Sequence, residues 1–142
     1  MFRSVTNDLM VSPQIGLDAV AEAKALGVTL IINNRPEGES EDQVPGADIE
    51  AAAHAAGLEY VAIPITHSGF SQPQVEAMVA ALQGAEGKVL AYCRSGTRST
   101  LLWALAESAQ GGDPDSLTNM AAKAGYDLSP VRPLMDMLKA QA

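Results

Sequence analysis

The hydrophobic positions of the chain fall into two alternating patterns. Short apolar runs with the length and composition of buried strands occur at residues 28–32, 58–63 and 89–92. Each run follows a segment in which apolar residues recur at helical spacing, at about residues 17–26, 48–56 and 71–82. Three more helical segments are predicted at about residues 100–107, 115–124 and 130–139. A helix followed by a strand is therefore predicted three times in succession.

Strands that alternate with helices pair in parallel, because each return crossing is made by a helix that covers the sheet. We therefore predict an α/β fold, a three-layer sandwich with a mostly parallel central sheet of four to five strands. Residues 3–5 and 9–11 are expected to add a small antiparallel pair. Residues 33–46 predict a surface loop, whose acidic run 37–42 is expected to face solvent. Ligands should bind at the carboxyl ends of the strands.

Composition narrows the class of protein. A length of 142 residues, 47% of them hydrophobic, suits one domain with its own core, and we expect a single domain over residues 1–142. The formal charge of −8 opposes binding to nucleic acid or to an anionic membrane. Residues 1–8 lack a signal-peptide pattern and no apolar run is long enough to cross a membrane, so a cytoplasmic protein is expected. The single cysteine excludes an internal disulfide.

That cysteine follows the third predicted strand and opens a polar loop, after which a helix begins. The loop reads Cys93-Arg94-Ser95-Gly96-Thr97-Arg98-Ser99. A helix N-terminus offers unpaired N–H groups and the positive end of the helix dipole, which stabilise a thiolate or a bound anion. Gly96 lets the backbone curl into a nest of N–H groups, and Arg98 offers a bidentate fork for the oxygens of an anion. We predict Cys93 and Arg98 to be catalytic. The other loop residues are predicted to bind substrate: Arg94, Ser95, Gly96, Thr97 and Ser99.

The order strand, Cys93, Gly96, Arg98-Ser99, helix resembles the active loop shared by cysteine phosphatases and rhodanese-type sulfurtransferases. Further matches lie at residues 12–14, 31–39, 55–60, 63–65 and 91–99. Together they make the chain similar to the phosphatase-like domain of the beta-lactamase hydrolase-like proteins, from about Leu9 to Leu105. The resemblance implies a fold like that of dual-specificity phosphatases. It leaves two activities open, because some members of the family are described as sulfur transferases that work beside persulfide-handling enzymes.

Two departures from the phosphatase pattern favour sulfur transfer. Four residues separate Cys93 from Arg98, as in single-domain rhodaneses, and this tighter ring suits a sulfane sulfur better than a phosphoryl group. Residues 64–69, where a phosphatase carries its acid, contain no carboxylate. We expect a sulfurtransferase that moves sulfane sulfur from thiosulfate or a persulfide through a Cys93 persulfide. The alternatives are a protein-tyrosine-phosphatase-like hydrolase acting through a Cys93 phosphocysteine, and a non-catalytic redox or persulfide sensor.

Two residues outside the loop are further candidates for substrate binding. His67 lies where a phosphatase has its acid and is a candidate proton donor, although an exposed loop residue is the simpler interpretation. Arg35 follows a strand at its carboxyl end, so it either reaches the same crevice or pairs with Glu37 or Glu39. No metal and no cofactor are expected. The expected partners are a small anionic substrate (thiosulfate, a persulfide or a phosphoester) and an external thiol acceptor, since no second cysteine exists to take the sulfur from Cys93.

Overall fold

A computed structural model describes residues 1–142 as alternating strands and helices. In chain order the elements are β1 (Arg3–Ser4), β2 (Leu9–Ser12), α1 (Asp18–Ala25), β3 (Val28–Asn33), α2 (Gly46–Ala55), β4 (Glu59–Ala62), α3 (Gln72–Gly84), β5 (Lys88–Tyr92), α4 (Thr97–Ala109), α5 (Pro114–Lys123), the 3-10 helix η1 (Ser129–Val131) and α6 (Arg132–Gln141). Every helix and strand predicted from the sequence is present, with boundaries that differ by a few residues.

The sheet has five strands in the order β1-β2-β5-β3-β4. Strands β2, β5, β3 and β4 run parallel, and β1 pairs antiparallel with β2. The predicted α/β fold with a mostly parallel sheet is therefore confirmed. One detail differs from the expectation. Strand β2 pairs antiparallel with β1, but it also pairs in parallel with β5, and all four of its residues are buried, so it belongs to the central sheet.

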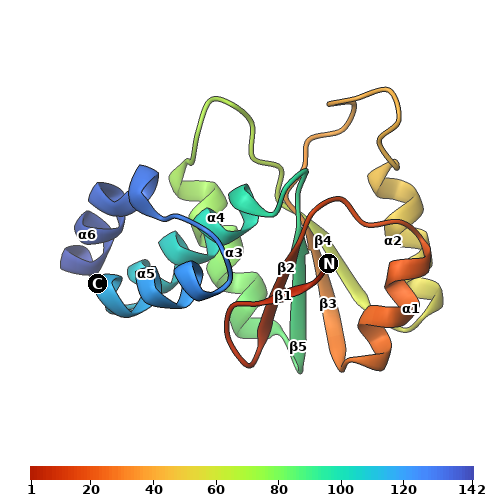
Figure 1. The fold of residues 1–142 in the computed structure, drawn as a ribbon, viewed down its shortest axis with the longest axis horizontal. Helices are drawn as coiled ribbons and strands as arrows, with labels where there is room; N and C mark the ends of the chain where they lie inside the picture. The colour runs from red at the N-terminus through yellow and green to blue at the C-terminus, as the bar shows by residue number, and fades with distance from the viewer.

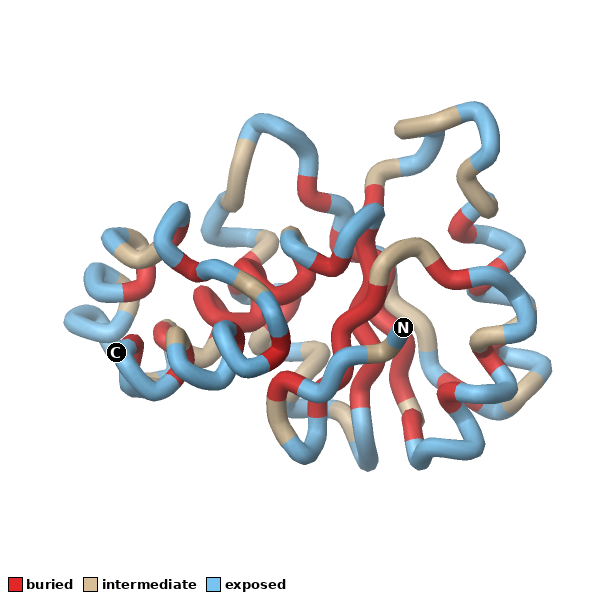
Figure 2. The backbone as a smooth tube through the Cα atoms, in the orientation of Figure 1, coloured by how far each residue is buried: buried red, intermediate tan, exposed pale blue.

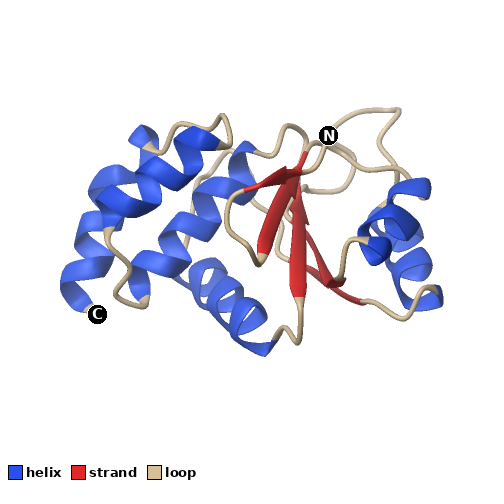
Figure 3. Ribbon diagram, turned by 60° about the horizontal axis from the view of Figure 1, so that its bottom comes forward, coloured by secondary structure: helices blue, strands red, loops and turns tan.

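Helices cover both faces of the sheet, which makes the predicted three-layer sandwich (Figures 1 and 3). Helices α1 and α2 pack on one face, and α3 to α6 lie on the other. Side chains alternate along each strand, so β3 sends Ile31 into the core under α1 and α2, and Leu30 and Ile32 into the core under α3 to α6. The buried residues accordingly run through the middle of the molecule, along the strands and α4 (Figure 2).

The parallel strands bring three loops to one edge of the sheet, at the top of Figure 1. These loops follow β3, β4 and β5, and the third of them is the cysteine loop. Helix α4 begins within that loop, at Thr97, and is mostly buried, with Leu102 and Leu105 inaccessible to solvent. A loop fixed between a central strand and a buried helix has little freedom to move, which suits a preorganised site. None of the helices combines the length and apolar character that crossing a membrane requires.

Candidate active site

Cys93 lies at the end of β5 and its side chain is fully buried beneath the loop that follows. Its Sγ accepts a hydrogen bond from the backbone N–H of Gly96 at 3.1 Å. Gly96 is the N-cap of α4 and has a φ of +91°, which glycine adopts far more readily than residues with a Cβ. The loop therefore curls back over the sulfur as the sequence predicted, and points a backbone donor at it.

Backbone contacts from the N-terminal part of the chain hold the cysteine loop from outside. The N–H of Cys93 donates to the carbonyl of Ser12 at 3.4 Å, and the N–H of Gln14 donates to the carbonyl of Arg94 at 3.3 Å. The C=O and N–H groups of a trans peptide point in opposite directions, so a carbonyl turned outward leaves the N–H of the next residue turned inward. Gln14 thus holds the carbonyl of Arg94 outward, which turns the next N–H, that of Ser95, to the inside of the loop.

The Arg98 guanidinium is held by a carboxylate that the sequence did not assign to the site. Its Nη1 and Nη2 donate to the two carboxylate oxygens of Glu39 at 2.7 and 2.8 Å, and Nη1 also donates to the carbonyl of Ile65 at 2.7 Å. The bonds to Glu39 raise the pKa of Arg98 above its already high value. A guanidinium has five N–H donors, so these three bonds leave the Nε–H and one Nη2–H for a bound anion.

Glu39 also pairs with Arg35, which donates from Nε at 2.9 Å. Arg35 is buried and completes its hydrogen bonds with Gln14 at 3.0 Å and Ser40 at 3.3 Å. Hydrogen bonds from Arg98, followed by those from Arg35, lower the pKa of Glu39 to about 2. The prediction that the acidic run 37–42 faces solvent is therefore wrong at Glu39. Its side chain is only 17% exposed, because two arginines enclose it. Arg35 reaches the site as a support for this carboxylate.

A polar hollow of about 400 Å³ opens above these groups. Its lining residues are Pro36, Glu39, Thr66, His67, Arg94 and Arg98. The structure thus brings together His67, Arg94 and Arg98, three of the residues predicted from the sequence. Arg94 forms no ion pair, so its charge is available at the mouth of the hollow. His67 is exposed on the loop that follows β4.

The hydroxyl residues of the loop divide into two groups. Ser95 and Thr97 are exposed and bond to each other, with 3.0 Å between Oγ and Oγ1. Ser99 instead is fully buried and donates to the side-chain oxygen of Asn34 at 2.7 Å. The Asn34 amide in turn donates to the carbonyl of Ile63 at 2.9 Å, so it joins the three loops at this edge of the sheet. Ser99 thus uses its hydroxyl to tie the loop to Asn34, and its predicted contact with substrate stays a prediction.

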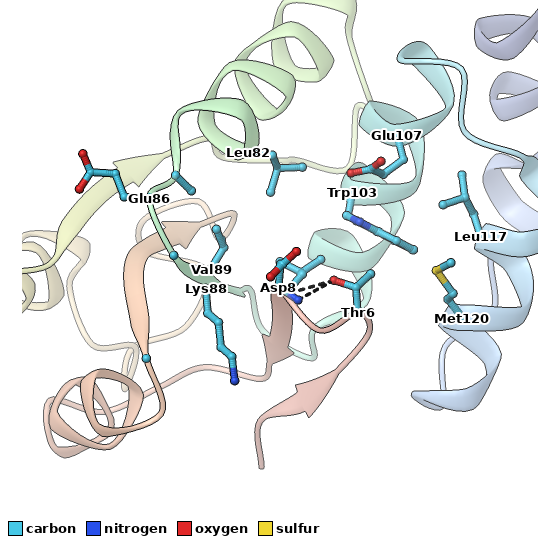
Figure 4. A pocket seen from close by; sticks show the side chains of 14 residues that line it. Thr6, Asp8, Leu82, Glu86, Lys88, Val89, Trp103, Glu107, Leu117 and Met120 are labelled. Atoms are coloured by element: carbon cyan, nitrogen blue, oxygen red, sulfur yellow. Dashed lines mark hydrogen bonds between the residues drawn. The ribbon is translucent and has the colours of Figure 1, made fainter.

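The largest cavity, of about 650 Å³, lies at the opposite end of the strands (Figure 4). Trp103, Glu107 and Met120 are among its lining residues, and none of the predicted site residues lies there. We place the candidate active site at the smaller hollow because Arg94 and Arg98 line it and the charge of Arg98 acts on Cys93, which is buried beneath the loop. No three His, Cys, Asp or Glu side chains come together in an arrangement suited to a metal ion.

Comparison with known families agrees with this geometry. Residues 1–111 match the family model described as the phosphatase-like domain of beta-lactamase hydrolase-like protein. The chain belongs to this family. A beta-lactamase hydrolase-like protein of Xylella fastidiosa is 36% identical over 126 residues, which cover 87% of this chain and 29% of that protein. A protein of the same description from Agrobacterium fabrum is 34% identical over 73% of this chain and 24% of that protein. The chain thus spans less than a third of the length of these relatives.

Solved structures similar to this family member have the cysteine-phosphatase fold. A candidate phosphatase from Neisseria meningitidis superposes with a TM-score of 0.83 and 33% identity, over 96% of both chains. A second candidate phosphatase, from Shewanella putrefaciens, has a TM-score of 0.77 and 24% identity over 99% of this chain and 91% of its own. The catalytic domain of the S. cerevisiae PP-IP phosphatase SIW14 has a TM-score of 0.71 at 13% identity, over 96% of this chain and 83% of its own. The dual-specificity-phosphatase-like fold is confirmed.

Proposed function

We propose that this phosphatase-like domain is a sulfurtransferase in which Cys93 carries sulfane sulfur as a persulfide. The observation that carries the proposal is that Glu39, the only carboxylate that lines the hollow, accepts hydrogen bonds from both Arg98 and Arg35. Two arginines lower its pKa to about 2, so it is ionised at neutral pH and has no proton to donate. Hydrolysis of a phosphoester needs a proton donor for the leaving oxygen, whereas transfer of a sulfane sulfur does not.

The proposed reaction has two balanced steps. The Cys93 thiolate attacks the sulfane sulfur of thiosulfate, a new S–S bond forms, and sulfite leaves with the electrons of the bond that breaks. A persulfide donor reacts in the same way and leaves as its thiolate. In the second step an external thiolate attacks the outer sulfur on Cys93, forms its own persulfide, and releases the Cys93 thiolate. The N–H of Gly96, which lies 3.1 Å from Sγ, stabilises the Cys93 thiolate that attacks in the first step and is released in the second.

Within the hollow, Arg94 and Arg98 are suited to hold the negative charge of the donor. Arg98 keeps two N–H donors free beside Glu39, and Arg94 has no competing ion pair. Ser95 and Thr97 supply exposed hydroxyls at the rim of the loop. The acceptor that we propose is an external thiol, because Cys93 is the only cysteine of the chain.

A phosphatase is the second candidate function, and the position of His67 favours it. The imidazole lines the same hollow as Arg98 and is a possible source of the proton that Glu39 cannot supply. The family description and the phosphatase fold support the same alternative. Such an enzyme would act through a phosphocysteine at Cys93 on a small phosphoester.

One sample distinguishes the two functions. The protein is incubated with thiosulfate or glutathione persulfide and its intact mass is measured, while an aryl phosphate is offered to the same preparation. We expect one added sulfur on Cys93, released by cyanide or glutathione, no phosphate release, and no reaction of either kind in Cys93→Ser. Phosphate release that depends on Cys93, without a persulfide, would establish the phosphatase instead. A sulfur or oxygen adduct on Cys93 that neither cyanide nor glutathione removes, without phosphate release, would indicate a sensor.

A further inference from the structure

Tyr126 contacts the cysteine loop from a part of the chain that the family match does not include. It lies between α5 and η1, beyond residue 111, where the match ends. Its hydroxyl donates to the carbonyl of Ser95 at 3.2 Å. A Cβ built on Gly96 would collide with the Tyr126 hydroxyl and lie 3.0 Å from its Cζ. The tyrosine therefore contacts Ser95 and Gly96, the two residues that one peptide bond joins.

This peptide bond links Tyr126 to the nucleophile. The chain has no cis peptides, so the carbonyl of Ser95 and the N–H of Gly96 point in opposite directions. The carbonyl accepts from Tyr126 on the outside of the loop, and the N–H donates to Cys93 Sγ at 3.1 Å on the inside. A hydrogen bond to the carbonyl both fixes the rotation of the peptide plane and polarises its N–H.

We propose that Tyr126 is a positioning residue for the Cys93 thiolate: it holds the Ser95–Gly96 peptide in the orientation that directs the Gly96 N–H at the sulfur. The inference rests on the proposed function only in that Cys93 is the nucleophile. It adds a contribution from the C-terminal helices to a site that otherwise consists of loops at the sheet edge.

Arg3 holds Tyr126 in this position. Its guanidinium lies over the tyrosine ring, 5.5 Å from the ring centroid, and donates to the carbonyl of Ala124 at 3.0 Å. Burial raises the pKa of the Tyr126 hydroxyl, against a smaller opposing effect of Arg3, so the hydroxyl remains a donor at neutral pH. Arg98 of α4 and Tyr126 of the C-terminal segment are titratable groups whose pKa values respond to the charge of Cys93, and Arg3 acts in turn on Tyr126.

The test is the pH dependence of Cys93 alkylation, which is specific because the chain has one cysteine. Wild type, Tyr126→Phe and Tyr60→Phe are treated with iodoacetamide over a range of pH, and the modified fraction is followed by intact mass. Tyr60→Phe is the matched control, since it loses a hydroxyl that accepts from Asn33 at 3.0 Å and forms no hydrogen bond with the cysteine loop.

We expect Tyr126→Phe to move the midpoint of the pH profile upward by about half a pH unit. Below the midpoint, this shift makes alkylation about threefold slower. The shift is modest because the 3.2 Å bond is long for a hydroxyl donor. Tyr60→Phe should leave the profile unchanged. An unchanged profile in a folded Tyr126→Phe, or an equal shift in both variants, would overturn the proposal. Because alkylation does not require sulfur transfer, failure of the thiosulfate assay in wild type would reject the proposed function and leave this result standing.

Discussion

Replacing Glu39 by glutamine tests the ion pairs that position Arg98. The carboxylate accepts from Arg98 at 2.7 and 2.8 Å and from Arg35 at 2.9 Å, and these bonds hold its pKa at about 2 instead of 4.5. That difference corresponds to about 3 kcal/mol between the charged and neutral forms. Solvent screens part of it, so we expect Glu39→Gln to lower the free energy of unfolding by about 2 kcal/mol at neutral pH.

The pH dependence follows from the direction of the shift. A carboxyl group whose pKa is lower in the folded state stabilises the protein fully above its ordinary pKa of 4.5, and the contribution is lost as the pH falls toward 2. The difference between wild type and Glu39→Gln should therefore be largest at neutral pH and shrink below 4.5. Urea unfolding followed by circular dichroism, at neutral pH and at several acidic values where the wild type is folded, measures it.

Glu41→Gln is the matched control, because Glu41 lies in the same loop, is exposed and forms no ion pair. It should leave the unfolding free energy unchanged at every pH. Equal stability of Glu39→Gln and wild type at neutral pH would refute the argument. A difference that stays constant down to a pH of about 3 would refute it as well, since it would then come from packing and not from the charge of Glu39.

Three further substitutions test the loop itself. Arg98→Lys keeps a positive charge but loses the planar fork, so the Cys93-dependent rate should fall at least about tenfold in a steady-state assay. Gly96→Ala places a Cβ at a φ of +91° and against Tyr126, and should lower the unfolding free energy by at least about 2 kcal/mol in a denaturant titration. Ser99→Ala removes the bond to Asn34 and should cost about 1–2 kcal/mol of stability, while sulfur transfer per folded molecule stays close to wild type.

The strands and helices could be predicted where the signal is local. The apolar runs of β3 and β5 and the helical spacing around them are visible within a few residues, and so is the polar loop after Tyr92. Strand β2 was harder to predict because it has only four residues, directly before Pro13, and its parallel partner Val89–Tyr92 is far along the chain. Hydrophobic periodicity carries no information about such a distant pairing.

Cys93 and Arg98 could be selected as candidate catalytic residues because both lie in one short motif. The role of Glu39 was not, since an acidic residue among Pro, Gly and Ser has the same local pattern as an exposed loop. It faces Arg98 only because β3 and β5 are neighbours, which places the loops after them side by side. Tyr126 gave no signal at all, because a single aromatic residue in a turn between helices is compatible with any neighbour.

The charge distribution connects the site to the kind of substrate it can admit. The chain carries a formal charge of −8, whereas the hollow combines Arg94 and Arg98 with Glu39, and Arg35 lies behind that carboxylate. Salt limits the reach of this local positive charge to about 8 Å under physiological conditions. A large polyanion meets the repulsion of the acidic surface over most of its length, while a small anion that enters the hollow experiences mainly the arginines. The arrangement therefore favours a compact anion over nucleic acid.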